Sequence, residues 1–107
     1  MRTVAETPVF ARYAAKVWTD AEREAFVAWI AANPHAGAVI RGTRGCRKVR
    51  WSARGRGKRG GARVIYAVAT TGVVWLLIVT TKSALDALPG TFLERLRREI
   101  DDEPRRR

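Results

Sequence analysis

VIYAVATTGVVWLLIVTT, residues 64–81, carries no formal charge and decides the fold of this chain. Its length is near the minimum for a membrane-spanning helix. Two features favour β-structure instead, because β-branched residues are abundant and TTG at residues 70–72 is a turn signal between two shorter apolar runs. We therefore predict an antiparallel hairpin, with strands at residues 62–70 and 73–81, in a protein that does not associate with membranes.

The second strand of this hairpin contains the continuous apolar run VVWLLIV, residues 73–79. Such a run is typical of a strand that is buried on both faces. A segment of a partner protein could cover one of these faces or extend the edge of the sheet.

The segment before the hairpin is strongly basic. Residues 41–63 hold ten Lys or Arg and no Asp or Glu, and glycines interrupt the later part, SARGRGKRGGAR. A further strand is predicted at residues 46–52. Alternation along it places Val49 and Trp51 on one face, which we expect helices to cover, and Lys48 and Arg50 on the opposite, open face. Arg63 lies beside these two cations if the next strand pairs there.

Helices are predicted on both sides of the strands. Thr7-Pro8 is a start signal for a short first helix, and the capping box at residues 19–22 opens a second helix that stops at Asn33-Pro34. A second capping box at residues 91–94 opens a last helix, and residues 101–107 are expected to fray. Residues 34–45 are rich in turn signals, and a short strand is possible at residues 2–5.

This order predicts an α+β fold, in which N-terminal helices pack on a small antiparallel sheet followed by a C-terminal helix. The 107 residues fit one domain, spanning residues 1–107 with 104–107 as a frayed tail. The net charge of +11 favours an anionic partner such as RNA, DNA, an anionic membrane or an acidic protein. Cys46 is the single cysteine, and the N-terminus has no apolar run long enough for a secretory signal, so we expect a cytoplasmic protein.

The residue types exclude several kinds of site. The chain has no HExxH motif and no pair of cysteines, so we expect no metal and no cofactor. The lone His35 is expected in a solvent-facing loop. The glycine-rich segment lacks the Lys-Ser/Thr pair of a Walker motif, which disfavours nucleotide hydrolysis.

A cationic face able to hold a phosphodiester remains. Arg63 could donate two hydrogen bonds to one phosphate, whereas a lysine supplies a point charge or carries a proton. Surrounding cations favour the neutral form of a lysine, so the cluster suits proton transfer as well as binding. From charge alone, a phosphate-binding surface without chemistry is the simpler interpretation. Tyr66 and Trp51 could stack on a base, but alternation assigns both to the core face, and Cys46 is expected to fill space.

NPHAGAVIRGTRGCRKVRWSARGRGKRGGARVIY, residues 33–66, followed by LLIVTTKSALDAL, residues 76–88, resembles the HigB/RelE group of bacterial toxin–antitoxin toxins. Those chains commonly contain N-P-x-x-G-x-x-I-x-G-T-G-G-x-R-K-x-R-W, then G-R-G-K-x-G-G-x-R-V-I-Y, then an apolar strand ending in Y-A-K-x-x-x-D-D-L. The resemblance covers residues 33–88 in order. It implies a RelE-like fold and a ribosome-dependent endoribonuclease that cuts messenger RNA without a metal, by attack of the RNA's own 2′-hydroxyl on the adjacent phosphate.

The resemblance also implies residue roles. Lys48 and Arg50 match the two basic positions of the first catalytic strand, and Arg63 matches the arginine before V-I-Y. We expect Arg63 to clamp the phosphate, Lys48 to carry a proton and Arg50 to give electrostatic support. Further contacts to RNA are expected from Arg47, Arg54, Arg56, Lys58, Arg59 and Lys82.

The chain departs from the family pattern at several positions. Thr80 replaces the tyrosine of Y-A-K, and Arg44 replaces one glycine of G-T-G-G. Some relatives use an arginine and a late tyrosine where this chain has Ser83 and roughly Pro89. The general acid and the base-stacking group are therefore left open.

Two other functions remain open at this point. Gyrase-inhibiting toxins of the ParE type share the fold and bind a protein without cutting RNA. A non-catalytic RNA-binding domain is the third interpretation. A double-stranded-RNA-binding fold requires a basic start to its last helix, and the start of the last helix predicted here is not basic. The toxin interpretation implies an acidic cognate antitoxin, often a helix-turn-helix protein, besides the ribosome and messenger RNA as partners.

Overall fold

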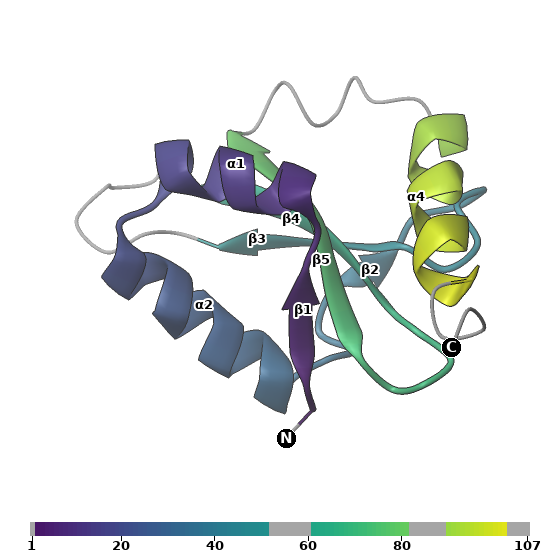
Figure 1. Cartoon of the computed structure of the whole chain (residues 1–107), viewed down its shortest axis with the longest axis horizontal. Helices are drawn as coiled ribbons and strands as arrows, with labels where there is room; N and C mark the ends of the chain where they lie inside the picture. The colour runs from purple at the N-terminus through teal and green to yellow at the C-terminus, as the bar shows by residue number, and fades with distance from the viewer. Residues whose placement is uncertain (1, 52–60, 82–89, 103–107) are drawn as a thin grey trace.

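The computed structural model describes residues 2–51, 61–81 and 90–102. In chain order the elements are β1 (Val4–Glu6), α1 (Pro8–Val17), α2 (Asp20–Ala32), β2 (Ala38–Val39), β3 (Arg47–Trp51), β4 (Ala62–Val68), β5 (Val74–Thr81) and α4 (Gly90–Asp102). The predicted α+β class is confirmed (Figure 1). The predicted tail at 104–107 lies outside the described residues.

All described strands belong to one five-stranded sheet in the order β1-β5-β4-β3-β2. The predicted hairpin forms its centre, where β4 and β5 pair antiparallel. Gly72 makes the turn with a φ of 93°, and its N–H donates to the carbonyl of Ala69 over 2.8 Å. A positive φ costs glycine little, because glycine has no Cβ. The strands end earlier at this turn than predicted, since residues 69–73 form the connection.

The prediction of a purely antiparallel sheet is wrong. β1 pairs with β5 in parallel, and β2 adds two residues to the outer edge of β3, inside the segment that is rich in turn signals and for which no strand was predicted. β1 is too short to show a sequence period, and its pairing depends on a strand about 70 positions away. The predicted short strand at 2–5 corresponds to β1, displaced by one to two residues.

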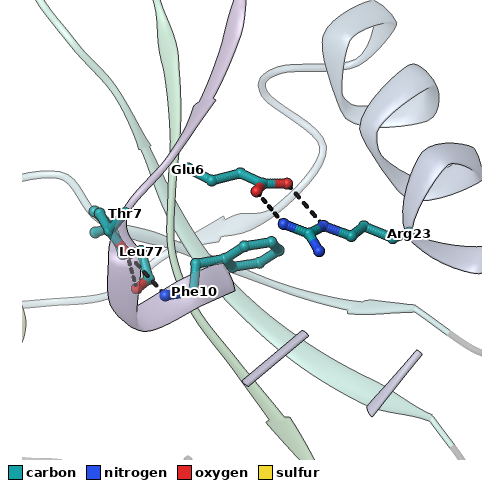
Figure 2. Close-up of polar contacts among 5 residues, drawn as sticks. All are labelled: Glu6, Thr7, Phe10, Arg23 and Leu77. Atoms are coloured by element: carbon teal, nitrogen blue, oxygen red, sulfur yellow. Dashed lines mark hydrogen bonds and ion pairs between the residues drawn. The ribbon is translucent and has the colours of Figure 1, made fainter. Parts of the chain in front are cut away.

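Thr7 links β1 to α1 and to the centre of the sheet (Figure 2). Its hydroxyl accepts a hydrogen bond from the N–H of Phe10 over 3.0 Å, which caps the helix as predicted, and donates to the carbonyl of Leu77 over 2.9 Å. Beside it, Glu6 accepts hydrogen bonds from the guanidinium of Arg23, and this ion pair ties β1 to α2 (Figure 2).

Helices α1 and α2 cover one face of the sheet. The capping box of Thr19 and Glu22 opens α2 as predicted. Phe10 and Phe26 are fully buried against the sheet, and Phe26 contacts the ring of Trp51 with centroids 5.4 Å apart. The remaining buried members of this core are Ala14, Trp18, Ile30, Ala62, Val64, Tyr66, Val74, Leu76 and Val79. The predicted helix-covered face with Val49 and Trp51 is therefore confirmed.

Helix α4 covers part of the opposite face, which had been predicted to be open. Its Leu93 and Ile100 are buried against Ile65 and Ile78 of the sheet. Figure 1 places α4 apart from α1 and α2, at the side of the molecule where β2 lies. Both faces of β5 are thus buried as predicted, but a helix of the chain itself provides the second cover.

The bounds of α4 differ from the prediction. The helix begins at Gly90, so Thr91 is already helical and the predicted cap at Thr91 is wrong. The helix also extends through Asp102, so the prediction that residues 101 and 102 fray is wrong. In the described part of the chain, no helix is both long enough and apolar enough to cross a membrane.

Arg97 fixes α4 to the rest of the fold through backbone carbonyls. Its Nε donates to the carbonyl of Arg44 over 3.1 Å, and its Nη2 donates to that of Val68 over 3.0 Å. One side chain therefore joins α4 to the turn before β3 and to the end of β4.

Candidate nucleic-acid interface

Strand β3 separates its side chains between the two faces as its sequence predicts. Val49 and Trp51 pack against the core under α1 and α2. Lys48 and Arg50 point to the α4 side of the sheet, because side chains alternate along a strand. Arg50 is exposed and Lys48 is half-buried.

The pairing of β3 with β4 brings the third cation to this place. Arg50 lies directly opposite Arg63, and Lys48 lies opposite Ile65. Directly opposed residues of an antiparallel pair project on the same face, with Cβ atoms roughly 5 Å apart. Lys48, Arg50 and Arg63 together line a shallow hollow of about 280 Å³. The predicted juxtaposition of the three cations is confirmed, while their chemical roles remain predictions.

Like charges directly opposite one another are unfavourable in a sheet. Two unit charges about 5 Å apart repel by about 1 kcal/mol in water, and by more where the surroundings are less polar. None of the three described residues that line this hollow is acidic. An anion bound in this hollow, such as a phosphate, would be attracted by all three cations.

Arg63 occupies a rigid position within the cluster. Its strand, β4, lies between β3 and β5, and its neighbours Ala62 and Val64 are fully buried. The Nε atom of Arg63 is buried, so the side chain lies against the sheet instead of extending into solvent. Its guanidinium is therefore better positioned than that of an arginine on an exposed loop.

Arg47 has a structural function that sequence reasoning missed. Its Nη1 donates to the carbonyls of Gly37 and His35, over 2.6 and 3.3 Å. These contacts hold the loop before β2 against β3. The alternation of β3 gave a weak signal, since it places Arg47 on the other face from Lys48, and its predicted contact with RNA stays a prediction.

Several predicted positions lie outside the described residues. Four of the expected RNA contacts belong to the glycine-rich segment and one follows β5, and two of the departures from the family pattern lie nearby. These positions are Arg54, Arg56, Lys58, Arg59, Lys82, Ser83 and Pro89.

The nucleophilic and aromatic candidates belong to the core, as predicted. Cys46 is fully buried, its thiol donates to the carbonyl of Leu93 over 3.5 Å, and burial raises the pKa of the thiol. Burial likewise raises the pKa of Tyr66, whose hydroxyl accepts from the N–H of Gly37 over 2.9 Å. Neither is placed to act on a substrate at the cationic hollow.

His35 is exposed, as the loop prediction requires. The described residues contain no group of His, Cys, Asp and Glu side chains that could hold a metal ion.

A larger hollow, of about 550 Å³, lies between β1 and α2. Its charged lining is mixed, with Arg2 and Arg23 beside Glu6, Asp20 and Glu24. Mixed charge gives no preference for a polyanion, and Glu6 and Arg23 already pair with each other. We therefore assign the candidate interface to the smaller, purely cationic hollow.

This cationic hollow can bind an anion, screen its charge and position it against a rigid sheet. These are the tasks that phosphodiester chemistry requires of a protein when the nucleophile is part of the substrate. A comparison of the chain with models of known protein families finds no match.

Proposed function

We propose that this protein is the toxin of a type II toxin–antitoxin system, of the HigB/RelE type, and cleaves messenger RNA on the ribosome. The observation that carries the proposal is the pairing of Arg50 with Arg63, with Lys48 on the same face and in the same hollow. The ordered resemblance of residues 33–88 to that group supports it further. A RelE-like fold is part of the proposal.

In the proposed reaction, the 2′-hydroxyl of one nucleotide attacks the adjacent phosphorus. The P–O5′ bond breaks, which leaves a 2′,3′-cyclic phosphate on one fragment and a 5′-hydroxyl on the other. One proton leaves the 2′-oxygen and one arrives at the 5′-oxygen, so no metal or redox partner is required.

Each of the three cations has a different role in the proposed reaction. Arg63 holds the phosphate through its fork of N–H donors, and Arg50, directly across the strand pair, stabilises the charge that develops in the transition state. Lys48 carries a proton between the reacting oxygens and the surroundings. The protein acts in the cytoplasm, and its net charge of +11 draws it to the ribosome and to the acidic segment of its cognate helix-turn-helix antitoxin.

The test is a purified translation system in which the 5′ ends of the messenger are mapped by primer extension. Wild type is compared with Arg63→Ala, Arg50→Ala and Lys48→Ala. Arg12→Ala is the matched control, because Arg12 is exposed on α1, which packs against the other face of the sheet. We expect new 5′ ends that require ribosomes, a loss of roughly 100-fold or more in rate for Arg63→Ala, and no change for Arg12→Ala.

Intact messenger and undiminished translation with the wild-type protein would overturn the proposal. An assay of DNA supercoiling by gyrase would then test the ParE-like alternative, in which the protein binds its target without cutting RNA. Binding to RNA without cleavage would favour the non-catalytic domain.

A further inference from the structure

Thr80 lies beside the cationic cluster through a second strand pairing. Arg63 is opposite Arg50 on β3 and opposite Thr80 on β5. Directly opposed residues share a face, so Arg50, Arg63 and Thr80 form one row across three strands. In the sequence, Thr80 stands out only as a departure from a family pattern.

This row lies where the α4 side of the sheet changes from buried apolar residues to accessible polar residues. In the neighbouring row, Lys48 is followed by Ile65 and Ile78, and both isoleucines are buried under α4. Arg50 is exposed and Thr80 is half-buried, so the row with the two arginines remains accessible. No hydrogen bond joins the Thr80 hydroxyl to another described residue.

The side chains of the row differ in hydrogen-bonding chemistry. A guanidinium donates hydrogen bonds and cannot accept them, and a protonated lysine has the same limitation. Phosphate oxygens accept hydrogen bonds and suit these donors. A ribose 2′-hydroxyl must instead donate its proton to an acceptor if it is to be oriented for attack, and within the row only the Thr80 hydroxyl has lone pairs to accept it.

We propose that Oγ1 of Thr80 accepts a hydrogen bond from the 2′-hydroxyl of the nucleotide whose 3′-phosphate Arg50 and Arg63 hold. Thr80 is thus a positioning residue that distinguishes RNA from DNA. This inference rests on the proposed function, because it assumes that the cationic hollow holds the phosphodiester of the substrate. The Arg63 side chain lies against the sheet, with its Nε buried. A phosphate held by Arg63 would therefore lie close to the sheet surface, where the short side chain of Thr80 can reach the neighbouring ribose.

The experiment measures binding of two fluorescent oligonucleotides, a short single-stranded RNA and a DNA of the same sequence, by fluorescence anisotropy at one fixed salt concentration. The proteins are wild type, Thr80→Val, Thr80→Ser and Arg63→Ala. Thr3→Val is the matched control, since Thr3 is exposed and lies next to Val4, which pairs with Val74 at the opposite end of β5 from Thr80.

We expect Thr80→Val to weaken RNA binding about 3- to 10-fold, the effect of one net hydrogen bond, and to leave DNA binding unchanged. Thr80→Ser keeps the hydroxyl and should retain the preference for RNA, which a merely structural role of Thr80 would not explain. Arg63→Ala should weaken the binding of both oligonucleotides, because both contain the phosphate.

The other outcomes distinguish the proposed role of Thr80 from the assignment of the cationic hollow as the phosphate site. If Arg63→Ala weakens both ligands but Thr80→Val leaves the ratio of RNA to DNA affinity unchanged, the role of Thr80 is refuted and the phosphate site stands. Equal weakening of both ligands by Thr80→Val also refutes it. If Arg63→Ala leaves RNA binding intact, the hollow is not the RNA site, and this inference fails together with the assigned site.

Discussion

Gly37 has almost no room for a side chain, although it lies in a loop. A Cβ built there would be 2.8 Å from the carbonyl oxygen of Lys48, 2.9 Å from Cε1 of Tyr66 and 3.0 Å from the Tyr66 hydroxyl. The N–H of Gly37 also donates to that hydroxyl, and its carbonyl accepts from Arg47. We therefore predict that Gly37→Ala destabilises the protein strongly.

The cost has two sources. Forcing a methyl group into a packed site costs about 1–3 kcal/mol in free energy of unfolding. Displacing Gly37 from Tyr66 leaves a buried phenol and a buried amide without their partners, which costs about 1–3 kcal/mol more. The expected loss of about 2–6 kcal/mol corresponds to a fall in Tm of roughly 10 °C or more for a domain of this size.

Urea unfolding followed by tryptophan fluorescence measures this cost. Gly42→Ala is the matched control, because Gly42 has a φ of 77° but no atom within 4 Å of a built Cβ. Its cost should be the backbone strain alone, about 1–2 kcal/mol. Tyr66→Phe removes one of the crowding atoms, so Gly37→Ala and Tyr66→Phe together should cost less than the sum of the single changes. A Gly37→Ala protein no less stable than Gly42→Ala would refute the reasoning from close approach.

Two further predictions concern α4 and alkaline pH. Arg97→Ala should lower the free energy of unfolding by about 1–3 kcal/mol in urea titrations, because two backbone carbonyls lose their donor. Among the described residues, the exposed Arg98 pairs with Glu94 on its own helix, so Arg98→Ala should cost less than about 0.5 kcal/mol. Equal effects of the two changes would contradict this assignment. Burial raises the pKa of Cys46 and Tyr66 above their ordinary values of 9.0 and 10.0, so the folded state retains these protons more strongly than the unfolded state. The stability that these two groups contribute is present below about pH 9 and is lost as the pH rises. The urea midpoint of unfolding should therefore fall from about pH 9 upward, and it should fall less steeply in Cys46→Ala. A midpoint that stays unchanged up to about pH 11 would contradict this pH dependence.

The candidate site was partly readable from the sequence. Alternation in RKVRW assigned Lys48 and Arg50 to one face, and the hairpin signal at residues 70–72 placed Arg63 on the strand beside them. The sequence could not reveal that Arg47 holds the loop of Gly37, because this contact depends on where a loop folds back. It also could not place Thr80 next to Arg63, because that neighbour follows from a register with a bulge between Ile65 and Tyr66.

The sequence by itself therefore determined most of the secondary-structure elements and the cationic character of this protein. Caps, turn residues and side-chain periods act over a few positions, so they defined both N-terminal helices, the central hairpin and the cationic face of β3. Tertiary structure decided the parallel pairing of β1, the addition of β2 and the docking of α4 over the face that alternation left open. Those features depend on apolar burial and register between segments far apart in the chain, for which a local pattern carries no information.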